Sequence, residues 1–135
     1  MKKSILEIAL RTALKELSSH PEFENYLHWS FIVSNNSIIE WATNNNGNNI
    51  PIHFGYHARL NWDGQPKTHA EFAAFKRARG LLTPNKKFEC VNIRLNRRGE
   101  IRMAAPCSCC SAFLCEMGCS KFYFTTAAGW AKSHI

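Results

Sequence analysis

The sequence predicts a single α/β domain, because segments with helical periodicity alternate with short apolar segments typical of strands. At 135 residues the chain is long enough for one hydrophobic core and too short for two. Its hydrophobic content of 45% argues against disorder. No stretch approaches the roughly 18 apolar residues of a membrane span, and Glu7 and Arg11 interrupt the apolar run near the N-terminus. We therefore expect one cytoplasmic domain over residues 1–135, without a signal peptide; delivery into another cell stays open.

Helix signals fall in three places. The expected helices cover about residues 4–18, 68–79 and 106–117. Ser4 and Glu7 have the spacing of a capping box ahead of the first apolar repeat. Gly80 is expected to close the second helix, since glycine suits the residue just past a helix C-terminus. Pro106 suits the first helical position of the third, and Gly118 is expected to end it.

Strand signals fill most of the remaining chain. The expected strands cover about residues 29–33, 38–43, 88–95, 101–103, 121–125 and 130–135, the last one short. Residues 44–67 have no clear period and are rich in Asn and Gly. Loops of this length inside compact domains usually carry function.

The positive charge is concentrated in residues 76–102. The whole chain has a net charge of +7, from 17 Lys and Arg against 10 Asp and Glu. The basic residues of this segment are Lys76, Arg77, Arg79, Lys86, Lys87, Arg94, Arg97, Arg98 and Arg102. Only Glu89 and Glu100 oppose them, so the rest of the chain is neutral. The pattern favours a surface for phosphates or nucleic acid; a solvated helix face with a basic hairpin tip is the alternative.

Two short motifs carry chemistry, and each begins an expected helix. His69 and Glu71 lie in the first, and Cys107 and Cys110 lie in the second. His69, Cys107 and Cys110 form a ligand set of zinc type that leaves the fourth tetrahedral position for water. Zinc lowers the pKa of that water, and Glu71 is placed to accept its proton. Taken singly, Glu71 could be a helix cap and the cysteines could be buried apolar residues.

The combination of His-x-Glu with a later Pro-Cys-x-x-Cys resembles the zinc-dependent cytidine deaminase superfamily. The resemblance covers about residues 28–135. It implies a three-layer α/β/α fold with a mixed central sheet of about five strands, the last short and antiparallel. It implies that the three ligands bind Zn²⁺ and that Glu71 is the proton shuttle. The Ala70 N–H would lie near the carbonyl oxygen of the base, and Asn44 would contact the sugar, with Asn45 and Asn46 as alternatives.

A more local resemblance concerns the substrate. Residues 91–107 look like bacterial and phage toxin-related deaminases, several of which act on cytosine in DNA. The implied reaction is hydrolytic deamination of cytosine to uracil in DNA, single strands favoured, by zinc-hydroxide attack on the amine-bearing ring carbon. Tyr56, Trp62 and Trp130 are expected to contact the substrate, because aromatic side chains stack on unpaired bases. Core filling is the alternative for each of them.

Other functions stay open at this point. A deaminase of a free cytidine or deoxycytidine nucleotide is the first alternative, because one phosphate also needs positive charge. An adenosine deaminase acting on RNA and a catalytically silent nucleic-acid-binding module are further alternatives. The oligomeric state is open, and no membrane partner is expected. The residues expected in the core are Trp29, Phe31, Phe72, Phe75, Cys90 and Phe122, with Cys115 and Cys119 as buried thiols.

Overall fold

The computed structural model describes residues 3–19, 26–44, 70–82, 87–106 and 108–134. The helices are α1 (Lys3–Leu17), α3 (Ala70–Ala78) and α4 (Ser108–Met117), with a 3₁₀ turn η2 (Arg79–Leu81). The strands are β1 (Tyr26–Ser34), β2 (Ser37–Thr43), β3 (Phe88–Asn96), β4 (Ile101–Arg102), β5 (Cys119–Thr126) and β6 (Gly129–His134). In the part of the chain that is described, no helix is long and apolar enough to cross a membrane.

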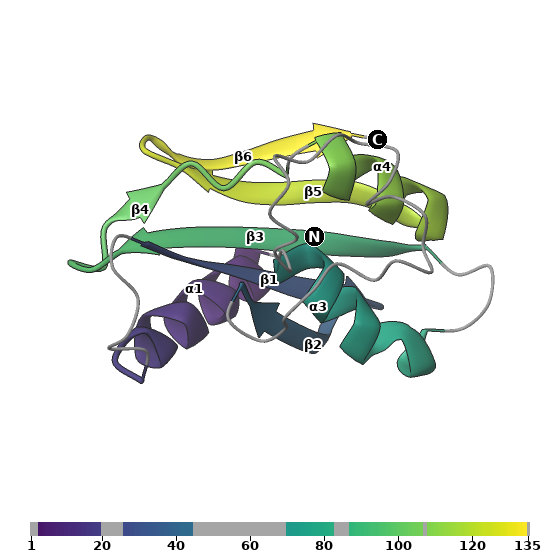
Figure 1. Ribbon diagram of the computed structural model, residues 1–135, viewed down its shortest axis with the longest axis horizontal. Coiled ribbons are helices and arrows are strands. Elements are labelled where there is room, and N and C mark those ends of the chain that lie inside the picture. Colours follow the sequence, from purple (N-terminus) through teal and green to yellow (C-terminus); the bar gives the residue numbers. More distant parts are fainter. Residues whose placement is uncertain (1–2, 20–25, 45–69, 83–86, 107, 135) are drawn as a thin grey trace, which may run out of the picture.

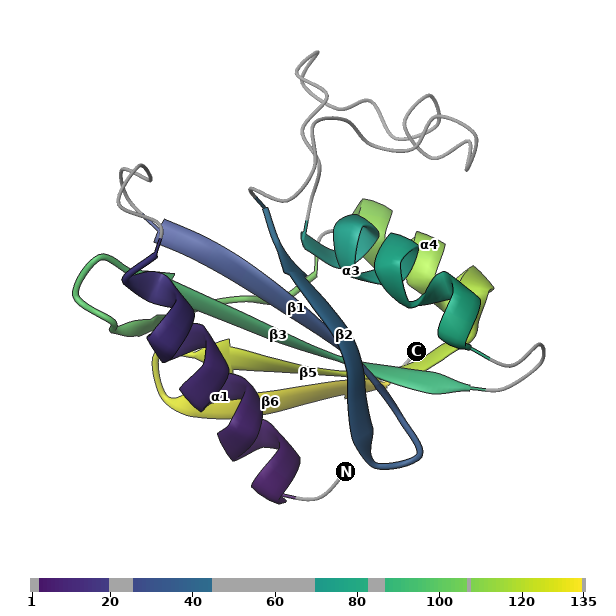
Figure 2. The ribbon, with the colours of Figure 1, turned by 90° about the horizontal axis from the view of Figure 1, so that it is seen from below.

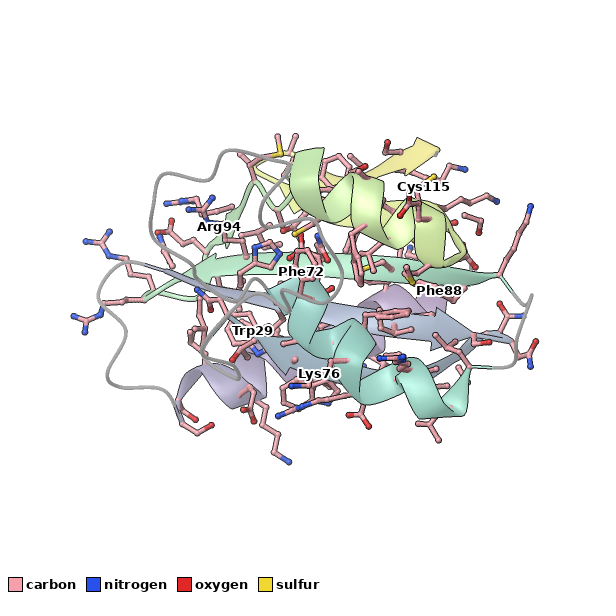
Figure 3. The ribbon with its side chains drawn as sticks, turned by 45° about the vertical axis from the view of Figure 1, so that its right-hand side comes forward. Trp29, Phe72, Lys76, Phe88, Arg94 and Cys115 are labelled. Atoms are coloured by element: carbon pink, nitrogen blue, oxygen red, sulfur yellow. The ribbon has the colours of Figure 1, made fainter. Side chains whose placement is uncertain are left out.

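A mixed sheet forms the middle layer. Its strand order is β2-β1-β3-β5-β6, and β4 pairs with the end of β3. β3 and β5 are parallel, whereas the other pairs are antiparallel. Helix α1 covers one face of the sheet, and α3 and α4 lie side by side on the other (Figures 1 and 2). The view with side chains shows the same layers, with α3 and α4 in front of the sheet and α1 behind it (Figure 3). The three-layer α/β/α fold with a short antiparallel last strand is therefore confirmed.

Helices α3 and α4 run in the same direction, opposite to β3. At the start of α3, Glu71 bonds to Asn92, and further along the helix Phe75 packs against Phe88 at the start of β3. The last turn of α4 reaches the same strand end, because the Phe88 N–H donates to the Gly118 carbonyl at 3.2 Å. Both helix N-termini therefore lie toward the carboxyl ends of β3 and β5, where parallel sheets usually place their sites.

The sheet separates two apolar layers. Between α1 and the sheet lies a cluster that includes Trp29, Phe31 and Ile93. Between the sheet and α3 and α4 lies a second cluster, in which Phe72 stacks on Phe113 with ring centroids 4.5 Å apart. All the aromatic residues expected in the core are buried, which confirms that part of the prediction.

Two helix ends differ from the expectation. Gly80 does not cap α3: the chain continues through it as η2 and leaves in an extended conformation at Leu82. Positive φ, which a glycine cap requires, occurs instead at Gly118 (φ 110°), which ends α4 as predicted. Pro106 lies outside a helix, and α4 begins at Ser108. The backbone of Ala104, just before Pro106, is bonded to strands of the sheet. The Ala104 N–H donates to the Thr125 carbonyl, and the Ala104 carbonyl accepts from the Asn92 side chain.

Replacing Phe113 by Ala should lower the free energy of unfolding by about 3–5 kcal/mol, because a fully buried ring is lost and a cavity remains. Phe113 contacts both Phe72 and Phe75, so the change would loosen α4 from α3. Urea denaturation measures the loss. The control is Leu81→Ala, which truncates a side chain that is 62% exposed and should change stability by less than about 0.5 kcal/mol. Equal losses in both variants would contradict the packing described.

Candidate active site

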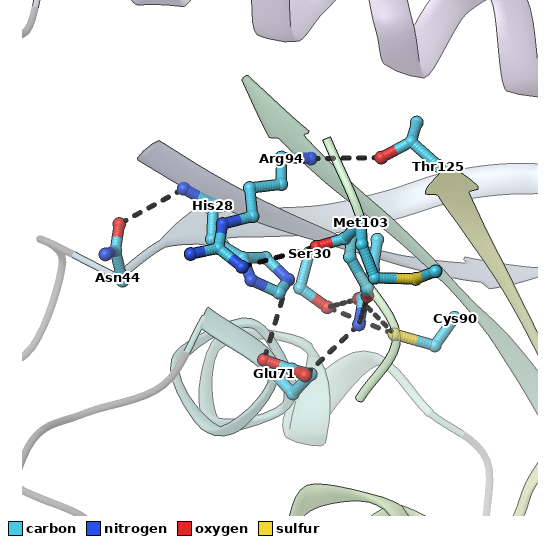
Figure 4. A network of polar contacts seen from close by, with 10 residues as sticks. His28, Ser30, Asn44, Glu71, Cys90, Arg94, Met103 and Thr125 are labelled. Atoms are coloured by element: carbon cyan, nitrogen blue, oxygen red, sulfur yellow. Dashed lines mark hydrogen bonds and ion pairs between the residues drawn. The ribbon is translucent and has the colours of Figure 1, made fainter. Parts of the chain in front are cut away.

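Glu71 is a carboxylate buried in an apolar layer. It lies in the first turn of α3, and only 2% of it is exposed. Asn92 Nδ2 donates to Glu71 Oε2 at 3.1 Å, and His28 Nε2 lies 3.9 Å from Glu71 Oε1 (Figure 4). Burying a carboxylate is costly unless it has polar partners, and these partners come from two different strands. Such an arrangement is typical of a functional group rather than of a helix cap.

The alternation of side chains along β1 and β3 builds this environment. In β1, the side chain of Ile32 belongs to the apolar cluster beneath α3 and α4. Ser30 and His28, two and four positions earlier, lie on the same face of the strand. In β3, Cys90 is followed on that face by Asn92 and then Arg94. The paired strands bring Ser30 opposite Asn92 and His28 opposite Arg94. This face therefore changes from apolar to polar to cationic toward the carboxyl end of β3.

Asn92 is the most highly connected polar residue of the site. It is fully buried. Its Oδ1 accepts from the Ser30 hydroxyl at 2.8 Å and from the Cys90 thiol at 3.3 Å. Its Nδ2 donates to the Ala104 carbonyl at 3.2 Å as well as to Glu71. Both ends of the amide are thus engaged.

The structure places Asn44 at the rim of this site. Asn44 directly follows β2, and its N–H donates to the His28 carbonyl at 3.1 Å. Its Oδ1 accepts from the His28 N–H at 3.3 Å. These two bonds fix Asn44 beside a residue that approaches Glu71. The contact of Asn44 with a sugar stays a prediction, and Asn45 and Asn46 lie outside the described residues.

One of the three expected zinc ligands is described. Cys110 lies in the first turn of α4, is fully buried and belongs to the same apolar cluster as Phe72. His69 and Cys107 lie outside the described residues; in the sequence they directly precede the first residues of α3 and α4. Within the described residues, no group of three or more His, Cys, Asp and Glu could hold a metal ion. The parallel helices α3 and α4 direct the positive ends of their dipoles toward the same end of the sheet, which favours anionic groups there.

Of the other residues expected to contact the substrate, one lies beside Glu71, one lies on the opposite face of the sheet, and two are outside the described residues. Ala70 is the first residue of α3 and is buried next to Glu71. Tyr56 and Trp62 lie outside the described residues. Trp130, on β6, packs against the apolar cluster beneath α1, on the opposite face of the sheet from Glu71. Trp130 is therefore not part of the candidate site.

The sequence interpretation did not identify His28, Ser30 or Asn92 as site residues. The expected strand began at residue 29, whereas β1 begins at Tyr26 and includes His28. The available signal was polar residues at alternate positions inside otherwise apolar strands. That signal equally fits a strand with one solvated face. Only the packing of α3 shows that these polar residues are buried in a site and not exposed to solvent.

The thiols outside the expected ligand set differ in accessibility. Cys90 is buried as predicted, and desolvation raises the pKa of its thiol well above the ordinary value. Burial also raises the pKa of Cys119, to about 12. Cys115, expected to be buried, is exposed on the outer side of α4 (Figure 3). It follows Leu114, which is fully buried, so neighbouring positions of the helix face opposite environments.

Iodoacetamide at pH 8 should therefore modify Cys115 much faster than Cys90 in the folded protein. The thiolate is the reactive form, and a raised pKa together with burial keeps Cys90 protonated and inaccessible. Mass spectrometry of peptide fragments separates the two sites, and modification in denaturant is the control in which both should react at similar rates. Rapid native labelling of Cys90 would contradict its placement beside Asn92.

Comparisons with known proteins agree with the three-layer arrangement. No protein-family model matches the chain, and no curated protein does so. Among solved structures, the chain is similar to the crystal structure of cytidine deaminase from Mycobacterium leprae, with a TM-score of 0.53 and 12% sequence identity. The match covers 91% of this chain and 88% of that chain. At this identity the likeness concerns the fold, and the chain has a cytidine deaminase-like fold.

Proposed function

We propose that the protein is a zinc-dependent hydrolase that converts cytosine to uracil, with Glu71 as its proton shuttle. The observation that carries the proposal is the Glu71 carboxylate, buried at the start of α3 between Asn92 and His28. Cys110 enters the same layer from the start of the parallel helix α4. The cytidine deaminase-like fold supports this assignment.

His69, Cys107 and Cys110 would hold the zinc ion. One imidazole and two thiolates form a donor set that suits zinc and leaves one position open. The described part fits this role, because Cys110 is a buried sulfur at a helix N-terminus, where the dipole favours the thiolate. When bound, the ion supplies a water molecule whose pKa is low enough for it to act as a nucleophile near neutral pH.

Glu71 would transfer the proton in this reaction. Its carboxylate accepts a proton as the water oxygen bonds to the amine-bearing ring carbon, and then delivers it to the ring nitrogen. The remaining proton of the added hydroxyl group then passes to the amine, so that the carbon–nitrogen bond breaks, ammonia leaves and the carbonyl of uracil forms. The Ala70 N–H, at the positive end of α3, would donate to the carbonyl oxygen of the base and fix its orientation.

The favoured substrate is cytosine in single-stranded DNA. The fold separates two groups of basic residues within residues 76–102, because α3 and β3 run in opposite directions. Lys76, Arg77 and Arg79 lie on the second half of α3 and η2, and the Arg77 side chain donates to the Trp41 carbonyl at 3.0 Å. The second group lies at the same end of the sheet as Glu71. We call it the hairpin arginines; its members are Arg94, Arg97, Arg98 and Arg102.

The hairpin arginines suit a polyanion better than a single phosphate. Arg94 pairs across the strands with His28, and so lies nearest to Glu71. Arg97 and Arg98 are exposed at the turn beyond β3, so the cationic surface extends away from the site. Glu100 opposes them only in part, through an exposed ion pair with Arg102 at 3.4 Å. A single strand of DNA whose phosphates bind along this cationic surface would present one unpaired base to Glu71.

A deaminase of a free deoxycytidine or cytidine nucleotide is the second candidate. The observation that favours it is Arg94, which lies opposite His28 on the neighbouring strand and could bind one phosphate. In that case the arginines of the turn would have no role in catalysis. The two candidates therefore differ in how far from Glu71 positive charge affects turnover.

Glu71→Gln should reduce deamination at least about 1,000-fold, because the isosteric amide cannot accept the proton that a general base removes. The zinc content and the melting temperature should stay near those of the wild-type protein, since the side-chain shape is retained. Plasma emission spectroscopy measures the metal, and mass spectrometry measures uracil. Cys110→Ser is the complementary variant and should lose zinc and activity together. Wild-type turnover in Glu71→Gln would refute the proposed mechanism.

A competition assay distinguishes the two substrates. The wild-type protein is mixed with a cytosine-containing single-stranded DNA oligonucleotide and equimolar deoxycytidine monophosphate, and mass spectrometry follows both. The oligonucleotide should convert first, and Arg97→Ala/Arg98→Ala should raise its KM and flatten its salt dependence, because two phosphate contacts are lost. Lys76→Ala/Arg79→Ala, which removes equal charge from the second half of α3 and from η2, is the matched control. Conversion of the monophosphate alone would refute the DNA assignment.

A further inference from the structure

We propose that Asn92 is a positioning residue for Glu71: its amide holds one carboxylate oxygen in place and leaves the other oxygen to exchange the proton. The proposal rests on the proposed function of Glu71 as proton shuttle and adds a role for a residue outside the two sequence motifs. Asn92 holds Oε2 through its amide, so that Oε1 is the oxygen that exchanges the proton.

The orientation of the Asn92 amide follows from its neighbours. The Ala104 carbonyl can only accept a hydrogen bond, so the part of the amide that faces it must be the NH₂ group. The second hydrogen of that group is then directed to Glu71 Oε2 at 3.1 Å. The opposite orientation would place the amide oxygen against the carbonyl oxygen and the carboxylate, where no hydrogen bond is possible.

Two donors on the other side hold the amide in this orientation. The Ser30 hydroxyl donates to Asn92 Oδ1 at 2.8 Å, and the Cys90 thiol donates to the same oxygen at 3.3 Å. Ser30 and Cys90 are fully buried, and their Oγ and Sγ atoms are 3.0 Å apart. Burial raises the pKa of the Cys90 thiol, which keeps it a donor. The amide is therefore fixed from β1 and β3 at once.

The consequence for Glu71 is a carboxylate that cannot rotate freely. Its Oε2 is held by the amide of Asn92, whereas Oε1 is directed toward His28, on the side where β1 and β3 become polar. A general base needs one oxygen in a fixed position toward its proton, and small displacements of such a group are costly in rate. Asn92 supplies that fixed position without contacting the substrate.

The first test compares Asn92→Ala, Ser30→Ala and Val91→Ala by steady-state kinetics. Asn92→Ala should lower kcat roughly 10- to 100-fold, the range found for residues that orient a catalytic group, with KM changed less than about threefold. Ser30→Ala keeps the bond to Glu71 and removes one restraint on the amide, so kcat should fall about 3- to 10-fold. Val91→Ala truncates the neighbouring residue on the opposite face of β3, and should lower the melting temperature with kcat unchanged. An unchanged kcat in Asn92→Ala, or an equal loss in Val91→Ala, would overturn the proposal.

The second test does not depend on turnover, and it remains decisive if Asn92→Ala fails to fold. In ¹H–¹⁵N spectra of the wild-type protein, both side-chain amide protons of Asn92 should exchange slowly, because both are bonded in a buried site. Glu71→Gln should shift one of them strongly and leave the proton bonded to Ala104 nearly unchanged. If neither proton moves in Glu71→Gln, the anchor does not exist. A wild-type protein that shows this signature and deaminates no cytosine substrate would instead refute the proposed function.

Discussion

The hydrogen bond between Asn92 and Glu71 joins the central strand of the sheet to the first turn of α3 inside an apolar layer. A carboxylate in that position would destabilise the fold if it had no polar partner. The partners must therefore come from the sheet, and they must lie on the face that α3 covers. This requirement determines which residues of β1 and β3 are polar, and where along the strands the apolar packing ends.

The two faces of the sheet therefore differ in the side chains that β3 contributes to them. Beneath α1, β3 contributes Val91, Ile93 and Leu95, three successive apolar residues of that face. On the other face, the alternate residues of β3 are Cys90, Asn92 and Arg94. Both faces therefore contribute buried apolar residues, and the face covered by α3 and α4 combines its packing with a polar site. The parallel helices α3 and α4 complete that face by bringing Glu71 and Cys110 to the same end of the sheet.

Much of the fold could be predicted from sequence because its signals are local. Apolar periodicity and Gly118 place most elements within two residues of their observed ends, although β1 begins three residues before its expected start. The two motifs singled out Glu71, which the structure buries beside Asn92. The polar residues of β1 and β3 could not be recognised in this way, since a polar residue in a strand is equally consistent with solvent. Their meaning depends on strand pairing, which brings Ser30 opposite Asn92 across 62 positions of sequence. Gly80 illustrates the same limit: glycine permits a cap, but the 3₁₀ turn that follows α3 makes one unnecessary.

The bond from Arg77 to the Trp41 carbonyl also affects how separate copies of the chain can meet. β2 is the outermost strand on its side of the sheet, and an outermost strand exposes backbone groups that can pair with a strand from another molecule. The guanidinium of Arg77 already occupies one of these carbonyls and places a positive charge beside it. Two copies approaching through β2 would have to displace both side chains and bring like charges together. A residue of the basic segment thereby opposes aggregation through the open edge of the sheet.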